Sequence, residues 1–443
     1  MMKNKTIEQI SGEGLCTGCG TCAGLCPQNA ITMVIDRKQG IYLPRLEREK
    51  CSECGICFKA CPGHSVDFNT FNREIFGSKV KDILLGNYLN LYTGFSTDNA
   101  LRYHSASGGL VTAILIFALG EGLIDGALVT RMSVENPLNP EPFIARTREE
   151  ILSAARSKYC PVPANIALKE ILQAGEEEKF AVVGLPCHLH GLRKAGILND
   201  SLKRKIVLHF GLFCNHTPAF TATDYILHKV KIRREAVKNL EYRGEGWPGK
   251  MKITLKDRII NLPLNDYWRS GFGSFFQPRR CTLCSDMAAE LSDISFGDAW
   301  IGEYSTDMVG TSLVISRSEM GEELLNNALD KGVISVAPIT RKKVIWSTRQ
   351  VAKFKKGVPA RFSILKRMGR QVPEYDMTFL KPGVTAYLSS LQCYFRMYLG
   401  KRRFLWGFLW NLSCWSGIPG RMILRIIKSL GLYGVIARIV RGF

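Results

Sequence analysis

The chain has 443 residues, 46% of them apolar, and a formal net charge of +21. This length and composition predict a globular protein of two or three domains. The chain contains fifteen cysteines, but it is too long for a small secreted disulfide scaffold, and no signal peptide is expected at its start.

Two cysteine runs in the first part of the chain share the spacing C-x2-C-x2-C-x3-C-P. This spacing is typical of bacterial-type ferredoxins, in which three cysteines hold one 4Fe–4S cluster and the fourth ligates the cluster of the other run. We therefore predict two clusters, the first held by Cys16, Cys19, Cys22 and Cys61, and the second by Cys51, Cys54, Cys57 and Cys26.

Zinc and disulfides are the alternatives for these cysteines. Zinc sites prefer two separated pairs of ligands, and disulfide frameworks belong to short secreted chains. Two complete runs in tandem favour iron–sulfur clusters over both. Such clusters need a reducing compartment, so we expect a cytoplasmic protein.

The ferredoxin domain is expected over residues 1–75. Between its cysteine runs, residues 30–35 and 40–44 are predicted strands around a turn at 36–39. Residues 69–90 are expected to connect this domain to the next.

A second domain is predicted to open with a strand over residues 91–96. It is followed by a loop of small residues, 104–109, that leads into an apolar helix. Such a helix start can bind a phosphate or diphosphate, although a well-capped buried helix would have the same sequence. The loop is neither a Walker motif nor a dinucleotide GxGxxG motif.

Further apolar strands are predicted over residues 125–130, 179–184 and 206–214, separated by helical stretches. This alternation predicts an α/β sheet covered on both faces, within an α+β protein overall. Residues 238–264 alternate differently and predict an antiparallel insertion. We expect the larger domain to comprise residues 85–165 and 166–375.

Four more cysteines have spacings that suggest a site. Cys187 and Cys214 follow two predicted strands, and Cys281 and Cys284 form a CxxC pair. Together they would complete a third four-thiolate site; zinc, redox activity and simple packing are the alternatives. Cys160, Cys393 and Cys414 have no partner in spacing and are expected to be packing residues.

These segments resemble the coenzyme F-420 hydrogenase/dehydrogenase beta-subunit family over roughly residues 10–320. The resemblance is carried by the following stretches: His104–Gly109, Ser157–Tyr159, Gly184–Leu192, Gly211–Cys214, Cys281–Asp286 and Ala289–Asp298.

The resemblance implies an FAD bound by the helix start and by the Ser157–Tyr159 segment. The residues it implies as contacts are Ser105, Ser107, Gly108, Gly109 and Lys158. It also implies a 4Fe–4S cluster on Cys187, Cys214, Cys281 and Cys284.

Chemistry also favours a flavin in this position. A hydride carrier such as coenzyme F-420 delivers two electrons together, whereas a 4Fe–4S cluster passes them singly, and a flavin converts between the two. We therefore expect an oxidoreductase in which electrons move between a hydride carrier, FAD, the clusters and a redox partner protein or membrane electron-transfer complex, in either direction. His188, His190 and Asp298 are considered as proton relays, with core packing as the simpler role.

Two other functions stay open. The chain is either a non-catalytic relay subunit of a larger complex, or a reductase of another substrate linked to surface-polysaccharide synthesis. A chlorophyll-type reductase is disfavoured because no transit peptide is expected.

The tail over residues 384–443 departs from the family. After Asp376 it has no acidic residue and ten basic ones. Residues 404–418 are too short to span a bilayer, whereas 421–428 and 433–440 can form amphipathic helices, with Trp406, Trp410 and Trp415 nearby. We expect contact with the inner membrane face, or packing on the protein itself or a partner; nucleic acid is not expected, because no binding motif accompanies the charge.

Overall fold

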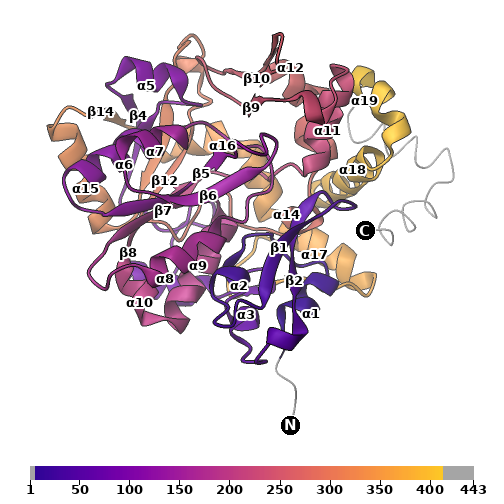
Figure 1. The fold of residues 1–443 in the computed structure, drawn as a ribbon, viewed down its shortest axis with the longest axis horizontal. Helices are drawn as coiled ribbons and strands as arrows, with labels where there is room; N and C mark the ends of the chain where they lie inside the picture. Colours follow the sequence, from indigo (N-terminus) through magenta and orange to yellow (C-terminus); the bar gives the residue numbers. More distant parts are fainter. Residues whose placement is uncertain (1–4, 413–443) are drawn as a thin grey trace.

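The computed structural model describes residues 5–412. In Figure 1 a small N-terminal unit lies below and to the right of a larger sheet domain, and two C-terminal helices, α18 and α19, lie at the right. The architecture is the predicted combination of a ferredoxin-like unit with a mixed α/β domain.

The N-terminal unit is built around an antiparallel hairpin of β1 (Ile31–Asp36) and β2 (Ile41–Leu46). The Asp36 carboxylate accepts the Gln39 N–H at 2.7 Å and fixes the turn. A short helix lies within each cysteine run, α2 (Thr21–Gly24) in the first and α3 (Ile56–Lys59) in the second. The other elements of this region are α1 (Ile7–Gly12), β3 (Ser65–Val66) and α4 (Phe68–Phe76). The predicted hairpin is confirmed.

The large sheet has eight strands in the order β14-β4-β13-β12-β8-β7-β5-β6. Strands β5, β7, β8 and β12 are parallel, and antiparallel strands extend the sheet on both sides. The strand bounds are β4 (Asn90–Ser96), β5 (Gly126–Met132), β6 (Pro140–Ala145), β7 (Phe180–Gly184), β8 (Ile206–Leu212), β12 (Ile294–Asp298), β13 (Ser312–Ser316) and β14 (Ile334–Pro338).

Helices cover both faces of this sheet, as its continuous apolar strands predict. One apolar cluster joins the sheet to α6, α7 and α15; others join its opposite face to α8, α9 and α10 and to α16. The bounds are α5 (Asn99–His104), α6 (Leu110–Gly120), α7 (Arg148–Ser153), α8 (Leu168–Gln173), α9 (Pro186–Leu198), α10 (Asp200–Lys205), α15 (Glu319–Asp330), α16 (Arg341–Lys356) and α17 (Val358–Arg367).

The predicted antiparallel insertion is also present. It is a three-stranded sheet of β9 (Asn239–Glu241), β10 (Lys250–Thr254) and β11 (Ile259–Pro263), in the order β11-β10-β9. It packs in one apolar cluster with α11 (Phe220–Lys229) and with the short helices α12 (Leu264–Tyr267) and α13 (Gly273–Phe275). Helix α14 (Arg279–Thr282) follows.

The helices α18 (Val384–Gly400) and α19 (Trp406–Leu412) pack on the protein itself. Trp406 is buried, its ring lies 5.7 Å from that of Tyr225, and its Nε1–H donates to the Gly400 carbonyl at 2.9 Å. Trp410 lies 5.8 Å from the same tyrosine ring. Self-packing, one of the roles expected for the tail, therefore holds for these two tryptophans. Residues 413–443, with the two predicted amphipathic helices, lie outside the described residues.

No helix among residues 5–412 is long and apolar enough to cross a membrane.

The N-terminal unit is joined to the sheet domain through α2 and α9. The Asn165 side chain donates to the Thr21 hydroxyl at 2.8 Å and to the His188 carbonyl at 2.9 Å. A methyl group at Gly191 would lie 2.2 Å from the Thr21 hydroxyl oxygen, so this glycine is needed for the two units to approach. A second link is the short strand β15 (Glu374–Tyr375), which pairs with β3 of the N-terminal unit.

We expect Gly191→Ala to loosen this junction, because the added methyl has no space beside Thr21. The free energy of unfolding should fall by about 1–3 kcal/mol, and amide hydrogen exchange should rise in α2. Gly196→Ala is the matched control on the same helix, since a methyl there would lie 3.7 Å from the nearest heavy atom. Equal behaviour of the two variants would contradict this assignment.

Candidate functional site

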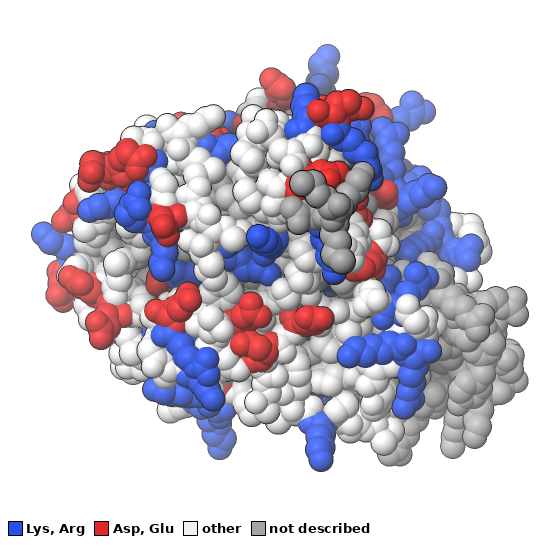
Figure 2. All heavy atoms as spheres, turned by 90° about the horizontal axis from the view of Figure 1, so that it is seen from below, with Lys and Arg blue, Asp and Glu red and all other residues white. Residues whose placement is uncertain are grey.

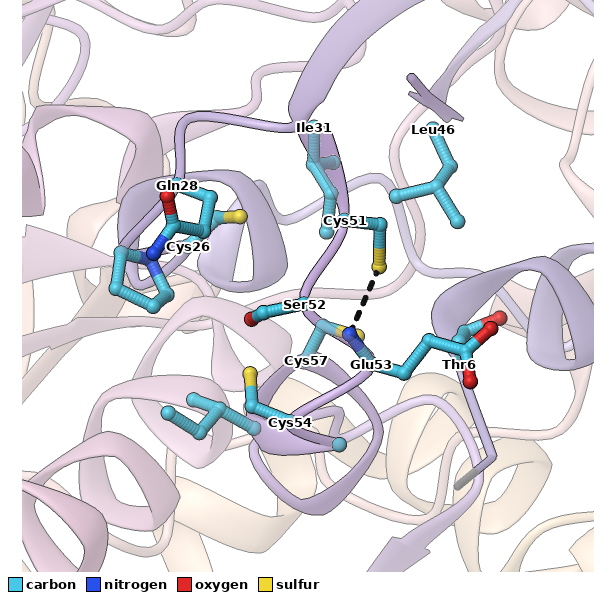
Figure 3. A pocket seen from close by; sticks show the side chains of 13 residues that line it. Thr6, Cys26, Gln28, Ile31, Leu46, Cys51, Ser52, Glu53, Cys54 and Cys57 are labelled. Carbon is cyan, nitrogen blue, oxygen red and sulfur yellow. Dashed lines mark hydrogen bonds between the residues drawn. The ribbon is translucent and has the colours of Figure 1, made fainter. Parts of the chain in front are cut away.

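Four cysteines of the N-terminal unit line one pocket. In Figure 3 the sulfur atoms of Cys26, Cys51, Cys54 and Cys57 point toward a common space. The Glu53 N–H donates to the Cys51 sulfur at 3.4 Å, and the Ala30 N–H donates to the Cys26 sulfur at 3.3 Å. The structure thus brings together the four residues predicted to hold the second cluster, with Cys26 supplied by the other run.

The four cysteines predicted for the first cluster form a more deeply buried set. The Gly18 N–H donates to the Cys16 sulfur and the Gly63 N–H to the Cys61 sulfur, both at 3.3 Å. Backbone N–H groups that donate to sulfur stabilise thiolate ligands and tune the clusters they hold. Burial raises the pKa of Cys61 to about 12, with a further contribution from Cys19.

The remaining four predicted ligands also converge. Cys187 lies in the first turn of α9, Cys214 follows β8, and Cys281 and Cys284 lie in and just after α14. Burial raises the pKa of Cys214 to about 12, and Cys281 and Cys284 contribute to that rise. Burial also raises the pKa of Cys187, with contributions from Cys19, Cys214, Cys281 and Cys284.

The chemistry of this donor set fits a tetrathiolate cluster. The fourteen cysteines in the described part of the chain are all free thiols, so this set is not joined by disulfides. Buried thiolates repel one another unless bound iron or nearby cations balance their charge. Ligation itself stays a prediction for all twelve cysteines.

Lys355 supplies one such cation. Its side chain is 1% exposed although it carries an amine. Burial alone would lower the pKa of this amine, but the nearby thiols of Cys284, Cys214 and Cys281 outweigh it and raise the pKa. The sequence gives no signal for this role, because Lys355 lies in a lysine-rich helix far along the chain from the cysteines.

Arg280 lies between the first and third cysteine sets. Its guanidinium group donates to the Gly63 carbonyl at 3.0 Å and to the Pro62 carbonyl at 3.2 Å, next to Cys61 in the chain. It also interacts electrostatically with Cys284 and Cys187 of the third set. Its position beside Cys281 is the only sequence signal for this residue.

The predicted phosphate-binding loop lies at the start of α6, beside β4 and β13. The Ser105 hydroxyl donates to the Leu101 carbonyl at 2.7 Å, and the Ser107 hydroxyl donates to the Thr311 carbonyl at 3.0 Å. Gly108 has no space for a side chain, since a methyl there would lie 2.5 Å from the Gly94 carbonyl oxygen. Gly109 has a φ of +76°, which glycine adopts without strain.

Both serine hydroxyls therefore hold the loop in place by hydrogen bonds within the protein. The anion-binding capacity of the loop therefore rests on the first-turn N–H groups of α6, which have no acceptor within the helix.

Arg156, two residues before Lys158, contacts the residue that precedes this loop. The Arg156 guanidinium donates to the His104 carbonyl at 3.0 Å, which brings the two predicted FAD-binding segments together. The Lys158 ammonium donates to the Ala155 carbonyl at 2.7 Å and to the Arg156 carbonyl at 3.1 Å. Burial lowers the pKa of Lys158 to about 7. A glycine-rich helix start with a basic side chain beside it fits the phosphates of a dinucleotide.

Asp298 is held in an ion pair, which makes it unsuited to relay protons. It ends β12, and its two carboxylate oxygens accept from the Arg243 guanidinium at 2.8 and 3.0 Å. Arg243 also donates to the Tyr159 hydroxyl at 3.2 Å. The pair joins the three-stranded insertion to the large sheet, and no local sequence pattern predicts its arginine.

The two histidines considered as relays have structural partners. His188 accepts from the Leu185 N–H at 3.1 Å, and burial lowers its pKa to about 4. His190 contacts the Asp286 carboxylate at 2.9 Å. Cys160 and Cys393 are buried, as expected for packing residues, and Cys414 lies outside the described residues.

Cys187, Cys214, Asp298 and the loop at Gly108 lie at one edge of the large sheet. Cys187, Cys214 and Asp298 follow or end the parallel strands β7, β8 and β12, and the loop at Gly108 contacts the end of β4. The carboxyl ends of parallel strands are the usual ligand-binding edge of such sheets.

Comparison with known proteins agrees with this geometry. Two family models, both described as coenzyme F420 hydrogenase/dehydrogenase beta subunit, match the chain. The model of the N-terminal part matches residues 91–169, and the model of the C-terminal part matches residues 177–342. Residues 15–65 match the "4Fe-4S dicluster domain". The chain belongs to the F420 hydrogenase/dehydrogenase beta-subunit family and carries an N-terminal 4Fe–4S dicluster domain.

Several relatives of this chain carry F420 in their names, and two of them show the extent of the similarity. The coenzyme F420 hydrogenase beta subunit of Methanothermobacter thermautotrophicus is 31% identical over 66% of this chain and 100% of its own length. One subunit of the F(420)H(2) dehydrogenase of Methanosarcina mazei is 26% identical over 75% of this chain and 87% of its own length.

A similar solved structure is a chain of the F420-reducing [NiFe] hydrogenase complex from Methanosarcina barkeri. It is 26% identical to this chain, with a TM-score of 0.52, over 65% of this chain and 95% of that one.

We expect Asp298→Asn to destabilise the protein, because the change leaves the Arg243 guanidinium buried without its ion-pair partner. The free energy of unfolding should fall by about 3 kcal/mol. Asp257→Asn is the control, since its ion pair with Arg258 is largely exposed and should contribute about 0–1 kcal/mol. Thermal unfolding of both variants checks this. A change no larger than that of the control would rule out a structural role for the pair.

Proposed function

We propose that this protein is an iron–sulfur flavoprotein that moves electrons between coenzyme F420 and a one-electron partner. Membership of the family and the names of the relatives support F420 as the hydride carrier. In this proposal FAD is bound at the start of α6 by residues 105–109 and by Lys158. Three 4Fe–4S clusters are bound by the three cysteine sets described above.

FAD would supply the chemistry that joins the two kinds of carrier, because it exchanges a hydride on one side and single electrons on the other. The chain's own residues hold the parts in order. The α6 start and the basic side chains Arg156 and Lys158 would orient the FAD phosphates at the sheet edge. Cys187 and Cys214 lie at the same edge and would place the third cluster beside it.

The cysteine sets form a path from this edge to the surface. The third set adjoins the first. The Asn165 side chain donates both to the Thr21 hydroxyl, which contacts the Cys19 sulfur at 3.2 Å, and to the carbonyl of His188, the residue after Cys187. The first and second sets exchange ligands through Cys26 and Cys61. Cys54 of the second set is exposed, so the second cluster would be the place where an external partner takes or gives single electrons.

The observation that carries the proposal is this adjacency of Cys187 to Cys19, because it makes one continuous route of three separate sites. Anaerobic reconstitution followed by cofactor analysis tests it. We expect about twelve iron atoms per chain, the sum for three cubane clusters, together with one FAD that bleaches when reduced F420 is added. About eight iron atoms per chain, the sum for two cubane clusters, with no flavin would contradict the proposal.

A matched pair of variants tests the flavin site. We expect Lys158→Met to lower the FAD content while the iron content is kept, because a charged contact to phosphate contributes about 1.5–3 kcal/mol. Lys179→Met removes an exposed lysine and should keep both cofactors. Full FAD content in Lys158→Met would place the flavin elsewhere.

A second function, a relay without flavin, is favoured by one observation. The hydroxyls of Ser105 and Ser107 and the ammonium of Lys158 all have partners within the protein. Twelve irons without FAD would favour that relay. Full cofactor loading without bleaching would instead favour another substrate, as expected for a reductase in surface-polysaccharide synthesis.

We expect Lys355→Met to lower the reduction potential of the third cluster, because reduction adds negative charge that the buried ammonium no longer balances. An anaerobic redox titration followed by electron paramagnetic resonance measures this. Lys353→Met is the control, since Lys353 is exposed on the same helix. An unchanged potential in a fully loaded Lys355→Met protein would contradict the assigned role.

A further inference from the structure

One side of helix α19 is buried against the protein and the other side is exposed. Its inner side carries Trp406 and Leu409, which are 4% and 1% exposed and pack in the apolar cluster that contains the three-stranded insertion. The chain is also packed tightly where α18 ends, just before α19. A methyl at Gly400 would lie only 2.3 Å from the Phe275 carbonyl oxygen. The segment is therefore held in one orientation on the protein.

Two large aromatic residues are exposed, one in the 3-10 turn Arg403–Leu405 that precedes α19 and one in α19 itself. Phe404 and Phe408 are 81% and 63% exposed, and they stand one helical turn apart. Exposed phenylalanines of this extent are costly to leave in water, and a fixed pair of them indicates a surface that is covered in use. We call these two residues, with the exposed Lys401, Arg402 and Arg403, the α19 patch.

The part of the chain that carries the patch has charge of one sign. After Asp376 the chain contains no acidic residue, and its ten basic residues include the three in the patch and five beyond residue 412. Figure 2 shows that, on the face seen from below, Lys and Arg gather toward the right-hand edge. Such a surface attracts a partner with many negative charges.

We propose that the α19 patch binds the surface of an anionic lipid bilayer. The two phenylalanine rings would enter the boundary between headgroups and acyl chains, while Arg402 and Arg403 remain at the level of the lipid phosphates. Residues 413–443 continue with Trp415 and further Arg and Lys but no Asp or Glu, so they add to the same attraction. This inference does not depend on the proposed reaction.

A bilayer fits these observations better than a protein partner. A bilayer needs only apolar side chains beside cations, without the shaped pocket that an aromatic anchor requires in a protein interface. Because no helix among residues 5–412 can span a membrane, that part of the chain would bind from one side of the bilayer.

Sedimentation with lipid vesicles tests this on the full-length, cofactor-loaded protein. The vesicles are pure phosphatidylcholine or phosphatidylcholine with about a third phosphatidylglycerol. We expect binding to the anionic vesicles only, weakened by salt. Phe404→Ser combined with Phe408→Ser should weaken it about tenfold, and each of Arg402→Gln and Arg403→Gln should weaken it about fivefold.

The matched control is Val134→Ser combined with Met308→Ser. These residues are 85% and 70% exposed, outside the patch, and their replacement should leave vesicle binding unchanged. Iron content and thermal unfolding show whether each variant folds. A second test removes residues 413–443, after which the remaining binding should still depend on Phe404 and Phe408.

Three results would overturn the proposal. Binding of the Phe404–Phe408 double variant at the parent level would assign any membrane contact to residues 413–443 alone. Equal binding to neutral vesicles would exclude the role of the cations. A self-associated protein that the double variant returns to monomers, with no vesicle binding by the parent, would assign the patch to a second copy of the chain.

Discussion

The proposed function depends on how the protein balances the negative charge that cluster ligation would place on its buried cysteines. Thiolates that meet in a low-dielectric interior repel each other, and each set must be offset by bound metal, by N–H donors or by cations. The described structure provides N–H donors and cations beside these cysteines. Backbone N–H groups donate to Cys16, Cys26, Cys51 and Cys61. Arg280 and Lys355 bring buried positive charge to the third set.

The fold brings these groups to one place by joining two units that are separate in the sequence. The parallel strands of the large sheet end at a common edge, which collects Cys187, Cys214 and Asp298. The ferredoxin-like unit is held against that region by the Thr21–Asn165 hydrogen bond and by the close approach at Gly191. Close packing at that junction keeps the distance between the first and third cysteine sets short, which electron transfer requires.

Much of this could be predicted from local sequence patterns, because cysteine spacing and strand periodicity are local. The hairpin of β1 and β2, the antiparallel insertion and the three cysteine sets follow from such patterns. Arg243 and Lys355 could not be found, because their roles depend on contacts with residues distant in the chain. The roles of Ser105 and Ser107 could not be predicted for the same reason. The sequence suggests that their hydroxyls bind a ligand, whereas in the structure both donate to backbone carbonyls. The sequence pattern around Trp406 suggests a membrane-facing segment, whereas burial against Tyr225 decides its position.

The central claim is that electrons from the hydride carrier reduce the flavin first and then pass from the flavin to the clusters. The most direct measurement mixes the reconstituted protein with one equivalent of reduced F420 in a stopped-flow instrument and follows the flavin and iron–sulfur absorption bands separately. The account predicts that the flavin band bleaches first and recovers as the iron–sulfur band bleaches. Bleaching of the iron–sulfur band with no earlier change in the flavin band, or a flavin that stays bleached beside oxidised clusters, would contradict it.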